Sequence, residues 1–217
     1  FDYSYILPAS LDMPPYGYLE NDTLTAPLSA QTGGSGDADP HSPGYAVGAF
    51  WRAGKMADAF DFGQVLPGFT RHAANYIRQH AHAAKPFFLY FAMPAPHTPW
   101  LPGEAYRGRS AAGDYGDYVE MVDAMVGKVL DAIDSSGLSS NTLVIFTSDN
   151  GPYWRPVLAE KYHHSATGIY RGMKADAWEG GHRIPFIARW PGKIKAGSAS
   201  YVTTTRTNLS ATCSELA

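Results

Sequence analysis

The sequence has one cysteine, Cys213, so the chain cannot form a disulfide bond within itself. It also lacks any apolar run near the roughly 18 residues that a membrane-spanning helix requires. Charged residues are sparse, at 17%, and 17 basic against 20 acidic side chains leave a net charge of -3. This balance excludes a broad basic surface for nucleic acid or an anionic membrane. Any anion that the protein binds must therefore be held by a few well-placed groups.

Hydrophobic residues fill 45% of the 217 positions, which is enough for a domain with a substantial core. Segment 24–60 contains many turn-forming residues, and we predict an irregular insertion or loop there. Its glycine-rich stretch 31–36 is interpreted as a surface loop, because no Lys-Ser/Thr pair follows the glycines as a phosphate-binding loop requires.

Apolar patterns predict an α/β fold, in which helices alternate with buried strands. The predicted helices are 69–83, 117–134 and one that begins at Asn208, and the predicted strands are 87–92, 142–147 and 185–190. The run at 87–92 is continuously apolar, which is typical of a strand buried on both faces in a parallel sheet. The first two strands with the helix between them form a βαβ unit, whose crossover should be right-handed.

Polar side chains follow the first two predicted strands. His97 lies beyond one strand, and Asp149 and Asn150 lie beyond the next. The carboxyl ends of parallel strands open on one edge of a sheet, so we expect these residues to lie near each other. Asp149 and Asn150 offer adjacent hard oxygen ligands, as Ca²⁺ and Mg²⁺ prefer. The alternative is a hairpin turn at Asn150-Gly151.

Two further side chains are candidates for binding an anion or moving a proton. His97 is a candidate proton donor or anion ligand, with a packed loop histidine as the alternative. Lys174 lies in a glycine-flanked loop, either as a point charge on an anion or as a solvated lysine. Glu179 and Arg183, which follow, are interpreted as an ion pair that holds this loop.

Other polar and aromatic residues could contact a substrate. His163 and His164 are adjacent, so their side chains diverge and at most one of them faces the site. Ser10, Asp12 and Trp100 could line a sugar pocket, or they could serve packing or lie on the surface.

Several strings, in a fixed order along the chain, resemble those of the sulfatase family in the alkaline phosphatase superfamily. They are KPFFLY at 85–90 leading to PHTP at 96–99, TLVIFTSDNG at 142–151, GMK at 172–174, and EGGHRIP at 179–185 continuing to WPG at 190–192. In addition, SLDMPPY at 10–16 resembles a string of bacterial arylsulfatase-like enzymes that act on sulfated sugars.

This resemblance implies an alkaline-phosphatase-like fold, with a mixed, mostly parallel sheet flanked by helices and incomplete at both ends. It implies a sulfuric ester hydrolase that removes sulfate from a sulfated carbohydrate or an aryl sulfate. By the same resemblance, Asp149 and Asn150 would ligate Ca²⁺, with Mg²⁺ as the alternative. Lys174 would hold the sulfate and its bridging oxygen, and His97 would contact the sulfate and protonate the departing alcohol.

The sequence departs from the family at the nucleophile. Sulfatases use a formylglycine made within a Cys/Ser-x-Pro-Ser-Arg motif, which these 217 residues do not contain. Cys213 lies in a different context, and we interpret it as a buried helix residue. We therefore expect residues 1–217 to be the middle and later portion of a sulfatase catalytic domain, lacking the N-terminal formylglycine region and inactive by itself.

Two alternatives remain open at this point. One is a phosphodiesterase or phosphonate monoester hydrolase of the same superfamily, and the other is a non-catalytic homologue that binds sulfated glycans. The partner that we expect is a sulfated small molecule or glycan, rather than nucleic acid or a membrane. Family habit places such a protein in the periplasm or outside the cell.

Overall fold

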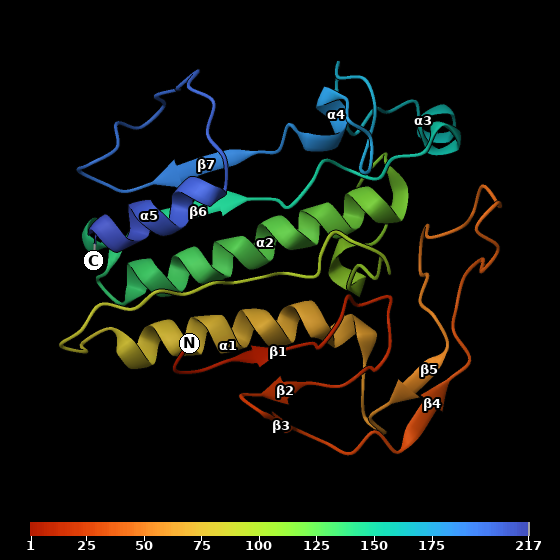
Figure 1. Ribbon diagram of the computed structural model, residues 1–217, viewed down its shortest axis with the longest axis horizontal. Coiled ribbons are helices and arrows are strands. Elements are labelled where there is room, and N and C mark those ends of the chain that lie inside the picture. Colours follow the sequence, from red (N-terminus) through yellow and green to blue (C-terminus); the bar gives the residue numbers. More distant parts are fainter. Residues whose placement is uncertain (217) are drawn as a thin grey trace.

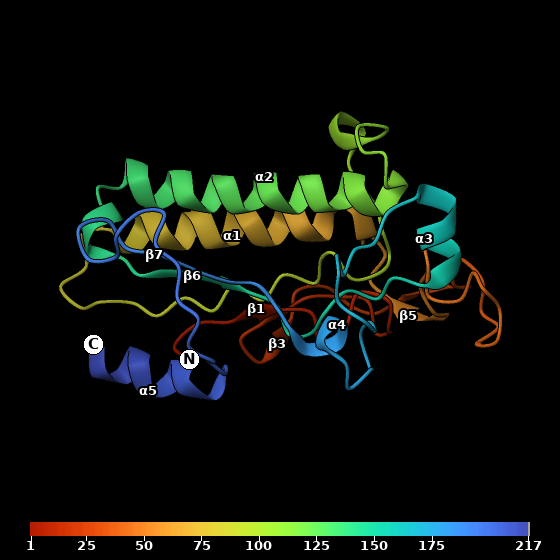
Figure 2. The same ribbon diagram turned by 90° about the horizontal axis from the view of Figure 1, so that it is seen from above.

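The computed structural model describes residues 1–216 and has a layered arrangement (Figures 1 and 2). Helices α1 (Val65–His80) and α2 (Gly113–Ser135) lie side by side as one layer. Extended segments run beneath them, and α5 (Thr207–Leu216) lies on the other side of these segments. Within the described residues, no helix is long and apolar enough to cross a membrane.

The remaining elements are short. The strands are β1 (Tyr5–Ile6), β2 (Leu19–Glu20), β3 (Thr23–Leu24), β4 (Ala30–Thr32), β5 (Gly54–Met56), β6 (Val144–Thr147) and β7 (Phe186–Arg189). The other helices are α3 (Pro156–Tyr162) and α4 (Glu179–His182), together with the 3₁₀ turns η1 (Phe62–Gln64), η2 (Glu104–Tyr106) and η3 (Ser139–Asn141).

Helices α1 and α2 confirm the two predicted helices and extend beyond their predicted starts. Their apolar faces meet in a core that includes Ile77 of α1 and Ile133 of α2, both buried. Gly137 ends α2 as predicted: it adopts a positive φ of 72°, which glycine tolerates without strain, and its N–H donates to Asp134 (3.1 Å).

The buried carboxylate of Asp117 links the start of α2 to the loop before it. Asp117 is 2% exposed and accepts hydrogen bonds from the backbone N–H groups of Gly108 (2.6 Å), Arg109 (3.0 Å) and Ser110 (2.7 Å). Burial alone would raise the pKa of Asp117, but the three backbone donors outweigh it and hold the pKa below its ordinary value. The ionised carboxylate therefore stabilises the folded chain.

We expect Asp117→Asn to destabilise the protein by about 2–3 kcal/mol, because one amide oxygen cannot replace a charged acceptor of three N–H groups. The free energy of unfolding, measured with urea, should differ from wild type above the unfolded-state pKa of about 4. That difference should shrink as the pH falls through the lower folded-state pKa. Asp123→Asn, on the exposed side of α2, is the control and should leave stability unchanged. Equal effects of the two substitutions would contradict this role.

The strand pairing differs from the parallel sheet that the sequence predicts. The α/β class is confirmed, and the predicted strands at 142–147 and 185–190 correspond to β6 and β7. These two pair antiparallel, however, with Val144 opposite Arg189 and Thr147 opposite Phe186. The strand predicted at 87–92 is wrong as a paired strand, since it is extended but belongs to no ladder among residues 1–216.

The side chains of segment 87–92 explain this difference. Phe87 and Leu89 pack against the core between α1 and α2. Phe88 and Tyr90, which alternate with them, are 61% and 71% exposed. The apolar run predicts that both faces of this segment are buried, but α1 and α2 cover only one of them. Figure 1 shows the segment running in the same direction as β6, so the carboxyl ends of both still point toward the same end of the molecule.

Segment 24–60 is mostly without regular structure, but it contains one short pair of strands. Strands β4 and β5 form an antiparallel ladder within it, with Ala30 opposite Met56. The predicted C-terminal helix is confirmed as α5. Cys213 lies on that helix, but it is half-buried rather than buried, because no side chain of α5 reaches the core.

Candidate functional site

The carboxylate–amide pair follows directly from β6. Asp149 is exposed, and the side-chain N–H of Asn150 donates to the carbonyl of Gly151 (2.8 Å). The hydroxyl of Ser148 donates to the carbonyl of Asn150 (2.9 Å) and holds the turn. Since the amide nitrogen of Asn150 is engaged, its oxygen is the atom left for a cation. Asn150-Gly151 does not form the alternative hairpin, because β6 pairs with β7 much further along the chain.

The loop that carries Lys174, residues 171–183, is called the lysine loop here, and it lies directly against this turn. The backbone N–H of Lys174 donates to the carbonyl of Pro152 (2.9 Å), and the N–H of Gly151 donates to the carbonyl of Gly181 (2.8 Å). A Cβ on Gly151 would lie 1.9 Å from the carbonyl oxygen of Gly180. The two backbones therefore touch where the glycines are, which brings Lys174 and the Asp149–Asn150 pair into one region.

The predicted ion pair within the lysine loop is confirmed. Arg183 Nε bonds Glu179 Oε2 across α4. The guanidinium of Arg171 stacks over the ring of Trp178, 3.8 Å from its centroid. These contacts hold the loop and leave the Lys174 side chain outside the ion pairs that residues 1–216 form.

His97 has a separate set of contacts. Its Nδ1 donates to the carbonyl of Thr98 (2.9 Å) and lies 3.8 Å from Oδ1 of Asp12. Within residues 1–216, no hydrogen bond or ion pair joins its ring to Asp149, Asn150 or Lys174. Aromatic packing connects the loop of His97 with the turn at Asn150. Trp100 lies three residues after His97, Trp154 follows the turn, and the centroids of their rings are 6.4 Å apart.

His163 and His164 follow α3, and both are exposed. His163 ends that helix with a positive φ of 48°. The ring of His164 lies edge-on to Trp154 at 5.6 Å, and its carbonyl accepts from the Trp154 indole (2.8 Å). His164 therefore packs beside the connecting aromatics, and neither ring is hydrogen-bonded to the Asp149 turn or the lysine loop within the described chain.

The Asp149–Asn150 pair suits a hard cation in the type of its donors. A carboxylate and an amide oxygen on adjacent residues can supply two of the six to eight oxygens that Ca²⁺ takes. No group of three or more histidine, cysteine, aspartate or glutamate side chains converges on a metal position among residues 1–216. By itself the pair therefore offers two oxygen donors, fewer than a complete Ca²⁺ coordination shell requires.

Asp12 and Arg52 are functional candidates whose pairing the sequence does not predict. Asp12 is predicted only as a wall of a sugar pocket, and Arg52 lies in the segment predicted to be irregular. They form an ion pair of 2.5 Å beside His97. The string around Asp12 is the sequence signal for that residue, whereas nothing in the local sequence of Arg52 identifies its partner.

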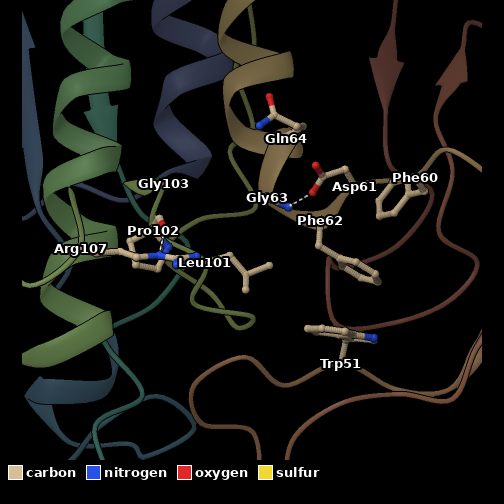
Figure 3. Close-up of a pocket in the computed structure, with 10 residues that line it drawn as sticks. All are labelled: Trp51, Phe60, Asp61, Phe62, Gly63, Gln64, Leu101, Pro102, Gly103 and Arg107. Carbon is tan, nitrogen blue, oxygen red and sulfur yellow. Dashed lines mark hydrogen bonds between the residues drawn. The ribbon is translucent and has the colours of Figure 1, made fainter. Parts of the chain in front are cut away.

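A hollow of about 460 Å³ is lined in part by Trp51, the neighbour of Arg52 in the chain, but by none of the predicted site residues (Figure 3). Its aromatic floor is Trp51 stacked on Phe62, with centroids 4.5 Å apart. Asp61 points at the backbone N–H of Gly63 (2.8 Å) and so caps the turn before α1. The hollow adjoins Arg52 and the loop after Trp100 along the chain, and Arg107 at its edge donates from Nε to the carbonyl of Pro102 (3.1 Å).

Comparison with known proteins assigns the family. The family model described as Sulfatase matches residues 68–217. The chain belongs to the sulfatase family. Its fold is accordingly the alkaline-phosphatase-like fold that the sequence resemblance implies. The matched region includes His97, Asp149, Asn150 and Lys174.

Similar sulfatases come from bacteria and mammals. An N-acetylgalactosamine-6-O-sulfatase of Bacteroides thetaiotaomicron is 32% identical over 226 residues, which cover 90% of this chain and 43% of that protein. The mouse N-acetylgalactosamine-6-sulfatase is 40% identical over 134 residues, 61% of this chain and 25% of its own length. This chain thus spans less than half the length of these relatives.

A solved sulfatase structure shares the arrangement of this chain. It was described in connection with the metabolism of multiple glycosaminoglycans by Bacteroides thetaiotaomicron. It superimposes with a TM-score of 0.73 at 28% identity, covering 90% of this chain and 46% of that one. The similarity includes the N-terminal 67 residues in large part, which the family model does not match.

Proposed function

We propose that this sulfatase domain takes part in hydrolysing the sulfate ester of a sulfated glycan. The observation that carries the proposal is the backbone contact between the Asp149–Asn150 turn and the lysine loop. The contact brings the backbone of Lys174 next to the turn that carries two hard oxygen donors. A sulfate ester bound next to a divalent cation needs a cationic side chain together with such donors. The names of the two N-acetylgalactosamine-6-sulfatase relatives make a 6-sulfated N-acetylgalactosamine the first substrate to test.

Each residue has a separate part in the proposed chemistry. Lys174 binds the sulfate oxygens as a point charge, and fixed positive charge lowers the energy of a transition state that gathers negative charge. With both ring nitrogens protonated, His97 donates the Nε2 proton to the oxygen of the departing alcohol, which otherwise leaves as an alkoxide, and keeps the proton on Nδ1. His163 and His164 contact the sugar at most one at a time, since their side chains diverge.

Asp149 and Asn150 would hold the divalent cation, for which we propose Ca²⁺. When bound, that ion polarises the sulfate oxygens as a Lewis acid. The neutral amide beside the carboxylate supplies an oxygen without a second negative charge, which keeps repulsion with the sulfate low. Mg²⁺ demands stricter octahedral geometry and is the less suited ion for an exposed turn.

The phosphoesterase alternative has no observation of its own in its favour. A phosphoesterase of the same superfamily would present more Asp and His ligands, and no such cluster is found within residues 1–216. A sulfated-glycan-binding homologue without catalysis is consistent with the absence of a Cys/Ser-x-Pro-Ser-Arg motif from the 217 residues. We therefore expect these residues to bind a sulfated sugar without turning it over, and formylglycine-dependent turnover by them would contradict that expectation.

Calorimetric titration with CaCl₂ tests the proposed cation site. We expect Asp149→Asn to weaken Ca²⁺ binding more than tenfold, because it removes the one charged ligand of the pair. Asp123→Asn removes an equal charge from the exposed face of α2 and should leave the affinity unchanged. Wild-type affinity in Asp149→Asn, or no Ca²⁺ binding by the wild type, would count against the site.

A further inference from the structure

One buried oxygen in the protein lacks a partner. Asp12 is 3% exposed, and within residues 1–216 its Oδ1 is a buried side-chain atom with no hydrogen-bond partner. Leaving a charged acceptor buried and unpaired is costly, so such an atom is usually explained by a group that it serves.

The group that Oδ1 faces is the ring of His97. Oδ2 of Asp12 is taken by the guanidinium of Arg52 (2.5 Å), while Oδ1 lies 3.8 Å from Nδ1 of His97. That distance is too long for a hydrogen bond but short enough for direct electrostatic attraction. Asp12 therefore lies between a fixed positive charge on one side and an imidazole on the other.

The carboxylate is held in place by its surroundings. The backbone N–H of Arg52 donates to the carbonyl of Asp12 (3.0 Å), which fixes the two residues together. The buried hydroxyl of Tyr16 lies 3.0 Å from the carbonyl of Asp12 and 2.7 Å from that of Arg52. Burial raises the pKa of Tyr16 to about 12, so its hydroxyl remains a donor at neutral pH.

Three oxygens lie near Nδ1 of His97: the carbonyl of Thr98, Oδ1 of Asp12 and, at 3.3 Å, the hydroxyl of Thr98. The carbonyl of Thr98 accepts at 2.9 Å, and Oδ1 of Asp12 faces the same nitrogen. The carbonyl and the carboxylate can only accept, and the hydroxyl can accept as well, so the three together favour the proton on Nδ1 and leave Nε2 as the nitrogen available to a ligand. A carboxylate that orients an imidazole in this way is a common arrangement in enzymes that use histidine.

We propose that Asp12 is a positioning residue for His97. Its buried carboxylate, anchored by Arg52, fixes the tautomer and the direction of the ring so that Nε2 faces the sulfate ester. The proposal deepens the proposed function and rests on it, because it assigns His97 the task of meeting the substrate. It also gives segment 24–60 a part in the site, since that segment supplies Arg52.

The test is the tautomer of His97, read from the ¹⁵N shifts of its ring in histidine-labelled protein, at a pH where the ring is uncharged. We expect wild type to hold the proton on Nδ1. In Asp12→Asn, the ratio of the Nδ1–H to the Nε2–H tautomer should fall about tenfold, since a charge-assisted interaction is lost. Asp39→Asn, an exposed carboxylate in the same half of the chain, is the control and should leave the ratio unchanged.

Asp12→Asn could fail to fold, because it leaves Arg52 facing a neutral amide. The double substitution Asp12→Asn with Arg52→Met removes that charge as well and carries the same expectation. A wild-type ring protonated on Nε2, or an unchanged ratio in a folded variant, would overturn the proposal. The readout needs no sulfate ester, so it separates this inference from the proposed function: a chain that binds no sulfated sugar but still shows the expected tautomer change would refute only the function.

Discussion

Gly151→Ala should destabilise the protein by about 3 kcal/mol, as expected when a core contact is overfilled. The added Cβ would lie 1.9 Å from the carbonyl oxygen of Gly180, which is backbone and cannot rotate away. The two loops must separate, and the hydrogen bond from Gly151 to Gly181 (2.8 Å) is lost with the contact. Urea denaturation measures the change, and hydrogen exchange of the Gly151 and Gly180 amides shows where the chain has opened.

Gly127→Ala is the matched control for this prediction. Gly127 lies within α2, and a Cβ there meets nothing within 4 Å. Alanine is the better helix former by about 1 kcal/mol, so this substitution should stabilise the protein slightly. If Gly151→Ala were as stable as Gly127→Ala, the two loops would not be in backbone contact.

Lys174→Met should weaken the binding of inorganic sulfate tenfold to a hundredfold. A charge-assisted hydrogen bond is worth about 1.5–3 kcal/mol, and each 1.4 kcal/mol corresponds to a factor of ten in affinity. Methionine keeps most of the length and apolar stem of the side chain, so the change removes the charge with little loss of packing. Isothermal titration with sodium sulfate gives the affinity.

Lys128→Met is the control for the effect of net charge on sulfate binding. Lys128 is exposed on α2, away from the lysine loop, so its loss lowers the net charge of the protein equally without touching the proposed site. A similar loss of affinity in both variants would mean that sulfate responds to overall charge rather than to a site at Lys174.

The helices were predictable from sequence, whereas the strand pairing was not. The apolar residues of α1 and α2 follow helical spacing, and Gly137 marks the end of α2. Local patterns are therefore enough to predict both helices. Pairing depends on which segments lie next to each other, and a local pattern does not contain this information. The run at 87–92 predicts a strand buried on two faces, but its exposed Phe88 and Tyr90 show that only one face is covered.

The candidate site was predictable in its parts. Motif strings identify His97, the Asp149–Asn150 pair and Lys174 individually. The glycine contact that joins the Asp149–Asn150 turn to the lysine loop depends on two backbones lying close together. The pair Gly180-Gly181 is the only sign of this contact in the sequence. The Asp12–Arg52 pair lies outside sequence reasoning altogether, because the two residues are distant in the chain and Arg52 lies in a segment without a recognisable pattern.

An NMR titration with sodium sulfate in the presence of Ca²⁺ tests most directly whether His97, Asn150 and Lys174 belong to one anion site. We predict that signals of these residues shift together and follow a single dissociation constant, while those of Lys128 and Asp123 stay in place. Shifts in the lysine loop with an unaffected His97 ring, or separate dissociation constants for the two regions, would contradict a shared site.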